Sequence, residues 1–180
     1  MQVALAPEFP VIERPDFESV YRDQFEHIWF TLRRLGVHER DLDDTTHDVF
    51  LVVNRRLMDF DPTRPVRPWV TGIAYRVASD ERRRARHRRE IIGDIPETID
   101  GASPQKALEA KEAQRLVLDA LTQLPMDQRA VLVMHDLQGM TMPEITEALD
   151  APLNTLYSRL RLGRRKFTLA VRRLRGREHV

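Results

Sequence analysis

Basic side chains gather near the C-terminus of the chain, and their charge is all of one sign. Between Arg159 and Arg177 the sequence has nine lysine or arginine residues and no acidic residue. A solvated helix surface ordinarily mixes both signs, because like charges one turn apart repel each other. Arginine also binds a phosphate or a guanine through two parallel hydrogen bonds. This segment therefore predicts a contact with nucleic acid.

Two helices separated by a short break are needed to position these arginines. Thr141 and Glu144 form a capping box that predicts the start of the first helix. Pro152 ends that helix near Asp150, and a second helix begins near Leu153. The apolar face of the second helix carries Leu153, Leu156, Leu160, Gly163, Phe167 and Leu174, and its polar face carries Asn154, Ser158, Arg161 and Arg165. The pair predicts a helix-turn-helix, whose second helix enters the DNA major groove.

A second basic segment lies in the middle of the chain. Residues 76–90 hold seven arginines and three acids, whereas residues 91–158 hold eleven acids and only four basic residues. The formal net charge of +1 hides this segregation. Two basic segments in an otherwise acidic chain predict two separate contacts with nucleic acid, and the acidic remainder suits a basic protein partner.

The composition excludes several other classes of protein. There is no cysteine, and the six histidines show no metal-ligand spacing, so we expect neither a metal nor another cofactor. Asp41, Asp43 and Asp44 resemble a calcium loop only superficially, because no glycine follows at the needed position. No phosphate loop, dinucleotide fingerprint or nucleophile elbow is present, so we expect no enzyme. Without an apolar run of ~20 residues or a signal peptide, no membrane insertion and a cytoplasmic location are expected.

Helical periodicity predicts an all-α protein. Apolar residues recur at helical spacing over about 17–35, 42–57 and 69–89, and again over about 108–124 and 127–139. Pro62, Pro65 and Pro68 predict a loop before the third of these helices. Residues 91–105 have the composition of a flexible, acidic linker. The prediction is therefore two small helical domains, at 14–90 and 106–176, of which the C-terminal one carries the helix-turn-helix.

Taken in order, these segments resemble the extracytoplasmic-function class of bacterial sigma-70-type RNA polymerase sigma factors. The stretch LTQLPMDQRAVLVMHDLQGMTMPEITEALDAPLNTLYSRLRLGRRKF is similar to the part of that family that reads the promoter −35 element. DLDDTTHDVFLVV resembles its polymerase-binding segment, and PWVTGIAYRVASDERRRARHR resembles the segment that melts and reads the −10 element. The resemblance covers about residues 14–174. It implies a protein that binds core RNA polymerase and promoter DNA, directs transcription initiation, commonly in stress responses, and is not an enzyme.

The resemblance also implies which residues meet the −35 duplex. The matching positions are Asn154, Thr155, Tyr157, Ser158, Arg159, Arg161, Arg164 and Arg165. Of these, Tyr157, Ser158 and Arg161 correspond to positions near base edges, and the arginines around them suit phosphates. The chain departs from the family at Asn154, where glycine is usual, and at Leu162, where some members carry arginine. These departures lie on the face that would read bases, so the −35 sequence preferred by typical members is not carried over to this chain.

For the melted −10 strand, the resemblance implies a set on the loop and the third helix, namely Arg64, Arg67, Trp69, Tyr75, Arg76, Arg82, Arg83 and Arg86. Trp69 can stack on a base, but it also begins an apolar stripe, and packing is the favoured interpretation. The family commonly has asparagine where Arg76 stands, and an arginine there can still hold a phosphate.

For core polymerase, the resemblance implies the set Asp44, His47, Asp48, Arg55 and Arg56. Without the resemblance, the acids would be read as a solvated helix start that the helix dipole favours. The family usually carries an anti-sigma partner as well, although nothing in this chain identifies it.

Two other interpretations remain open. A stand-alone helix-turn-helix regulator that binds duplex DNA as a dimer would explain residues 106–177 equally well. It would not explain the arginines at 82–89 with their loop and acidic helix. A polymerase-bound adaptor without promoter specificity is the second alternative, kept open by the departures at Asn154, Arg76 and Leu162.

Overall fold

The computed structural model describes residues 14–92 and 105–177, and it describes the side chains of residues 14–84 and 111–176. Within these two stretches every regular element is helical, which confirms the all-α prediction. The first stretch contains α1 (Phe17–Leu35), α2 (Leu42–Arg56) and α3 (Val66–Ile92). The second contains α4 (Gln105–Thr122), α5 (Met126–Leu132), a π-helical turn (Val133–Leu137), α6 (Met142–Leu149) and α7 (Leu153–Arg177). Single 3-10 turns at Glu39–Asp41 and Leu57–Asp59 flank α2.

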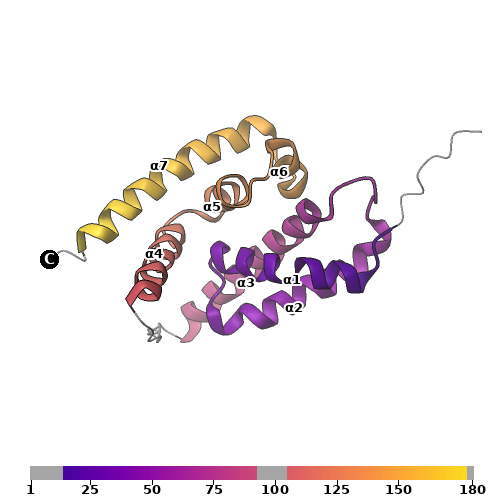
Figure 1. Cartoon of the computed structure of the whole chain (residues 1–180), viewed down its shortest axis with the longest axis horizontal. Helices are drawn as coiled ribbons and strands as arrows, with labels where there is room; N and C mark the ends of the chain where they lie inside the picture. The colour runs from indigo at the N-terminus through magenta and orange to yellow at the C-terminus, as the bar shows by residue number, and fades with distance from the viewer. Residues whose placement is uncertain (1–13, 93–104, 178–180) are drawn as a thin grey trace, which may run out of the picture.

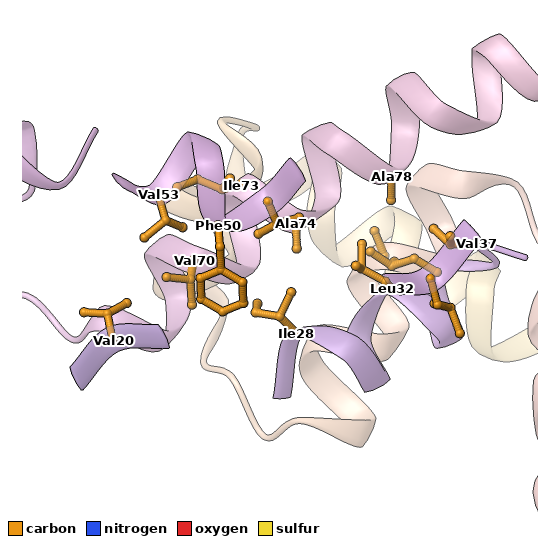
Figure 2. Packing of buried hydrophobic residues seen from close by; sticks show 14 of the residues in the cluster. Val20, Ile28, Leu32, Val37, Phe50, Val53, Val70, Ile73, Ala74 and Ala78 are labelled. Atoms are coloured by element: carbon orange, nitrogen blue, oxygen red, sulfur yellow. The ribbon is translucent and has the colours of Figure 1, made fainter. Parts of the chain in front are cut away.

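The N-terminal helices form a three-helix bundle around one apolar core. The Asp16 carboxylate accepts a hydrogen bond from the backbone N–H of Ser19 and caps the start of α1. Gly36 ends α1 in the left-handed region, with φ of 86°, where a side chain would be strained. Side chains from all three helices meet in the core (Figure 2), and those labelled include Val20, Ile28, Leu32, Phe50, Val53, Val70 and Ile73.

Pro68 does not extend the loop before α3 as the sequence predicted. The helix begins at Val66, so Pro68 is its third residue. The N–H groups of a first helical turn have no partner within the helix, so a proline there removes no hydrogen bond. The loop is therefore shorter than predicted and ends at Pro65.

The C-terminal helices build a second core and the helix-turn-helix. Buried residues of this core include Leu121, Val131, Met134, Ile145, Leu156 and Leu160. The sequence predicted a helix from about residue 127, and α5 begins one residue earlier, at Met126, with Asp127 in its first turn. Leu153 was predicted on the apolar face of α7, but its side chain is exposed, because it lies at the first position of the helix beyond the core.

The two halves pack against each other along α3 and α6 and along α1 and α4 (Figure 1). Tyr75 of α3 contacts both cores, and Ala130 of α5 is buried in the N-terminal core. The sequence predicted two domains, at 14–90 and 106–176, and no periodicity indicated how they would meet. Against the predicted linker at 91–105, α3 continues two residues further, to Ile92, and α4 begins one residue earlier than predicted, at Gln105. Residues 93–104 lie outside the described residues.

Acidification is expected to destabilise the fold through His27. The Thr71 hydroxyl donates its one proton to the Arg67 carbonyl at 2.8 Å, so His27 Nε2, at 3.0 Å, must donate to Thr71 Oγ1. Burial, and then the charges of Arg67 and Arg34, lower the pKa of His27 to about 4. An unfolded histidine has a pKa near 6.5, so the unfolded chain binds the extra proton between about pH 6.5 and 4. Stability is fully present above that window and is lost as the pH falls through it.

We expect unfolding by urea to show a loss of up to about 2 kcal/mol between pH 7 and pH 5 from this residue. His27→Gln should reduce that loss, whereas His47→Gln, at an exposed position, should leave it unchanged. Equal pH dependence in both variants would assign the effect to other groups.

Candidate nucleic-acid interface

The helix-turn-helix has the geometry that its sequence predicted. The Thr141 N–H donates to the Glu144 carboxylate at 2.7 Å and the Glu144 N–H donates to Thr141 Oγ1 at 3.5 Å, which completes the capping box. Asp150 closes α6 with φ of 49°, and α7 starts after a three-residue break. Gly163 lets α7 approach α5 closely, since a Cβ there would lie 3.0 Å from the Gln128 carbonyl oxygen.

The predicted −35 residues lie along the solvent-facing side of α7. The exposed members are Asn154, Thr155, Tyr157, Ser158, Arg161, Arg164 and Arg165, and Arg159 is half-buried. The apolar side of the helix carries the buried Leu156 and Leu160. Tyr157 and Leu162 also expose large apolar side chains on this helix. The helix therefore presents polar, cationic and apolar groups together, as a major-groove reader requires.

Two of these arginines are held by acids of the preceding helices. Arg159 Nε lies 3.2 Å from Asp127, and Arg164 donates to Asp136 through Nε at 2.8 Å and Nη2 at 2.6 Å. The hydrogen bonds from Arg164 hold the pKa of Asp136 below its usual range. Arg161 and Arg165 have no ion pair with any residue that the structure describes. Arg161 and Arg165 could therefore bind a phosphate or a base without first breaking an ion pair.

Replacing Asp136 by asparagine is expected to strengthen DNA binding. The change removes a carboxylate beside the α7 face and releases Arg164 to reach a phosphate. Each additional phosphate contact steepens the dependence of log affinity on log salt by about 0.9. We expect a few-fold gain in affinity for duplex DNA at low salt and a slope steeper by up to about one, measured by fluorescence anisotropy across a salt series.

Asp119→Asn is the matched control, since Asp119 pairs with Arg115 at 3.9 Å on α4 instead. An equal gain in both variants would attribute the effect to net charge alone. The exposed Asp136–Arg164 pair should contribute less than about 1 kcal/mol to stability, so Asp136→Asn should fold normally.

Half of the predicted −10 set contacts the C-terminal helices. Arg64 forms an ion pair with Glu147 of α6 at 3.0 Å, and Arg76 Nη1 donates to the Ala148 carbonyl at 3.4 Å. Arg82 Nη1 lies 3.3 Å from the Leu35 carbonyl and 3.5 Å from the sulfur of Met126. Tyr75 is packed between the two cores, as described above. The structure thus gathers these residues, but against protein.

The other predicted −10 residues lie elsewhere on α3. Arg67 and Arg83 are exposed, and Arg83 pairs with Asp80 at 3.0 Å. Trp69 packs on the core, with its ring centroid 4.7 Å from that of Phe60, in line with the favoured interpretation. The side chain of Arg86 lies outside the described residues.

The predicted polymerase-binding residues lie on α2 and its C-terminal end. Their side chains are all exposed, namely Asp44, His47, Asp48, Arg55 and Arg56. Buried residues of the same helix, such as Val49 and Phe50, anchor it in the core. This surface is open while the two halves are packed together.

Sequence reasoning missed the role of Arg129. Its side chain is 1% exposed and donates to three carbonyl oxygens. Nη1 lies 2.6 Å from Leu35 O, while Nη2 lies 2.7 Å from Thr122 O and 2.9 Å from Leu124 O. Burial, and then the charge of Arg82, lower the pKa of Arg129 to about 9. A helical arginine in a chain with 29 basic residues gives no sequence signal of such burial.

Neither a metal site nor a membrane-spanning helix is found in the part of the chain that the structure describes. No three histidine, cysteine, aspartate or glutamate residues there are grouped to hold an ion. Likewise, no described helix is long and apolar enough to cross a bilayer.

Comparison with known proteins finds two family models. Sigma-70 region 2 matches residues 21–88, and Sigma-70, region 4 matches residues 114–167. RNA polymerase sigma factor NccH of Alcaligenes xylosoxydans xylosoxydans is 29% identical over 141 residues, which cover 76% of each chain. RNA polymerase sigma factor CnrH of Cupriavidus metallidurans is 30% identical over 145 residues, again 76% of each.

The fold is also similar to solved structures. CnrH in complex with the cytosolic domain of CnrY superposes with a TM-score of 0.63 at 24% identity, over 85% of each chain. The sigma factor RpoE of Bartonella quintana, in complex with the anti-sigma factor NepR, gives a TM-score of 0.70 at 17% identity. That match covers 87% of this chain and 97% of the other.

Proposed function

This chain belongs to the extracytoplasmic-function class of sigma-70-type RNA polymerase sigma factors, and on that premise we propose how its surfaces divide the work of promoter recognition. It is a promoter-specific sigma factor, so its partners are core RNA polymerase and promoter DNA. A stand-alone helix-turn-helix regulator would account only for the match over residues 114–167. Sigma factors are not enzymes, and we assign this chain no catalytic residue, no cofactor and a place of action beside the polymerase in the cytoplasm.

The C-terminal domain, residues 106–176, reads the −35 element through α7. The observation that carries this assignment is the exposed row of Asn154, Ser158, Arg161 and Arg165, one helical turn apart, on the second helix of a helix-turn-helix. Arg161 lies within the first three turns, where recognition helices meet base edges. Thr155, Arg159, Arg164 and Arg165 bind flanking phosphates and set the register.

The N-terminal domain, residues 14–90, binds the polymerase and the melted −10 strand. Asp44, His47 and Asp48 form an exposed turn of α2 that suits a basic polymerase surface, with Arg55 and Arg56 beside it. The −10 strand follows the loop before α3 and the basic side of α3, from Arg64 to Arg83, where guanidinium groups neutralise its phosphates. Tyr75 offers the ring on which a base stacks. The linker, residues 91–105, joins the two domains.

An anti-sigma factor is a further partner that we propose. The support is that RpoE was solved with the anti-sigma factor NepR and CnrH with the cytosolic domain of CnrY. Both resemble this chain over most of its length, so a partner of that kind would find the same fold.

Run-off transcription tests the function directly. Purified core polymerase is incubated with a library of bacterial promoters, with and without the protein, and the start sites are mapped. New, sequence-defined starts that need the protein are expected, and their common elements give the −35 and −10 sequences. If no specific start sites appear, and the protein alone protects duplex DNA as a dimer, the chain is a stand-alone regulator instead.

Charge reversal on α2 tests the polymerase-binding surface. In the double variant Asp44→Lys, Asp48→Lys, both exposed acids become cations that a basic partner surface repels. We expect co-migration with core polymerase on gel filtration to be lost, while binding of the variant alone to duplex DNA does not weaken. Glu26→Lys, at an exposed position of α1, is the control that should still bind. Retained binding by the double variant would remove α2 from the interface.

A further inference from the structure

We propose that Leu162 of α7 reads the methyl group of a thymine in the −35 element, so that this chain requires an A·T pair where Leu162 meets the DNA. The inference deepens the −35 assignment proposed above and rests on it. Its basis is a leucine that lies exposed in the middle of a polar and cationic helix face.

Leu162 shares the face of α7 that carries the proposed base and phosphate contacts. Ser158 lies four residues before it, Arg165 lies three residues after it, and Arg161 is its immediate neighbour. Side chains three and four residues apart lie one above another on a helix. Leu162 therefore lies between Ser158 and Arg165 on the exposed side, in the same turn as Arg161. A helix that presents Arg161 to a base edge presents Leu162 to the same groove.

The folding of the domain does not account for this leucine. Its side chain is 41% exposed and belongs to neither of the two apolar cores. Leu160, two residues earlier, is buried, and residues two positions apart on an α-helix point in nearly opposite directions. Isolated leucines are common on protein surfaces. This one lies on the face proposed to enter the groove, where contact with DNA would remove its apolar surface from water.

Thymine is the base that suits a leucine. In the major groove, an A·T pair carries the C5-methyl group of thymine beside its hydrogen-bond donor and acceptors, whereas a G·C pair has no methyl group. A leucine forms no hydrogen bond, but it packs against the methyl group and so gains a contact at thymine that the other bases do not offer. An arginine at this position, which some members of the family carry, would favour guanine instead. Leucine at 162 therefore predicts an A·T pair in the −35 element.

Replacing thymine by uracil tests the contact, because the two bases differ only in the methyl group. The −35 element is first recovered by run-off transcription, as described above. Each thymine in either strand is then replaced in turn by deoxyuridine in a promoter duplex, and binding of the sigma–polymerase complex is measured by competition. We expect one replacement to lower the affinity about fourfold, the usual effect of burying one methyl-sized group.

Leu162→Ala removes the side chain that the thymine methyl group contacts. In this variant the ratio of the affinities for the thymine and uracil promoters should fall from about four to about one. Leu169→Ala is the matched control, since Leu169 is 43% exposed on the same side of α7, seven residues further along. It removes the same side chain about 10 Å from Leu162 and should keep the fourfold ratio. Loss of the ratio in both variants would contradict a specific contact of Leu162.

The outcomes separate this inference from the function on which it rests. A −35 element without thymine, or thymines that uracil replaces without loss, would overturn the contact while the mapped start sites uphold the sigma function. An equal loss in the unsubstituted chain and in Leu162→Ala would overturn it too, and would assign the methyl group to another side chain, such as the exposed Tyr157. Absence of specific start sites would remove the function and the inference together.

A change of specificity gives an independent test. In Leu162→Arg, the introduced guanidinium group can bind guanine but no longer packs on a methyl group. The unsubstituted chain should bind a promoter with guanine in place of the thymine at least about fivefold more weakly, and Leu162→Arg should reverse that preference. The added charge raises the affinity for both promoters alike, so the ratio of the two affinities is the readout. An unchanged preference would show that position 162 does not meet this base pair.

Discussion

Arg161→Ala is expected to lower the affinity of the sigma–polymerase complex for its −35 duplex by about 5- to 150-fold. The range corresponds to 1–3 kcal/mol, the usual contribution of one bidentate arginine–guanine contact. Arg161 is exposed on the third turn of α7 and has no ion pair within the described part of the chain, so its guanidinium can meet a base edge without first leaving an acid. Competition binding with single base changes in the −35 element should show relaxed preference at one position.

Arg172→Ala provides the matched control. Arg172 is exposed eleven residues further along α7, which is three turns and about 16 Å away on nearly the same face. The variant Arg172→Ala removes the same charge as Arg161→Ala, so it should weaken DNA binding slightly and by the same factor for all DNA sequences. If Arg161→Ala behaves in the same way, Arg161 contacts phosphate alone and another residue reads the base.

The local parts of this fold could be predicted because each depends on neighbouring residues. The capping box at Thr141 and Glu144 and the left-handed Gly36 follow from backbone groups within one helical turn. The apolar stripe of α7 follows from a period of 3.6 residues. Pro68 was placed wrongly because the same residue suits a loop and a first helical turn, and only the packing of α3 decides between them.

The contact between the halves could not be predicted because no periodic pattern encodes it. Gly72 and Ala148 are 76 residues apart, and each is unremarkable within its own helix. Of the predicted −10 residues, Arg64 and Arg76 came from the family resemblance, and the guanidinium group of each serves a phosphate and a protein oxygen equally well. The sequence shows that the loop before α3 and the side of α3 are basic. Which group binds to these arginines depends on the tertiary arrangement.

Arg129→Met is expected to be the most destabilising single change in the contact between the halves. The methionine fills similar space but leaves the carbonyls of Leu35, Thr122 and Leu124 without a donor. An unpaired buried carbonyl costs about 1–3 kcal/mol. The gain from no longer burying a cation offsets part of this, because replacing buried ions by apolar side chains is often favourable. We expect a net loss of about 3 kcal/mol in urea unfolding.

Arg129→Lys separates charge from geometry. The lysine keeps the positive charge, but its single ammonium group cannot reach the three carbonyls that the planar guanidinium spans. The stability of Arg129→Lys should therefore lie between that of the unsubstituted chain and that of Arg129→Met. If Arg129→Met is as stable as the unsubstituted chain, the desolvation of the cation outweighs its hydrogen bonds. Arg129 would then be retained for the geometry of the contact and not for its strength.

A double-mutant cycle with Gly36→Ala measures how much of the stabilisation by Arg129 acts across the contact between the two halves. Alanine at Gly36 is strained by its φ of 86° whatever its neighbours, and its Cβ would also collide with Nη1 of Arg129. In the Arg129→Ala background the collision disappears and only the backbone strain remains. We therefore expect Gly36→Ala to cost at least 1 kcal/mol less in that background, within the usual range for residues in contact. Additive effects would mean that the guanidinium moves aside freely, and that Arg129 stabilises only the C-terminal half through Thr122 and Leu124.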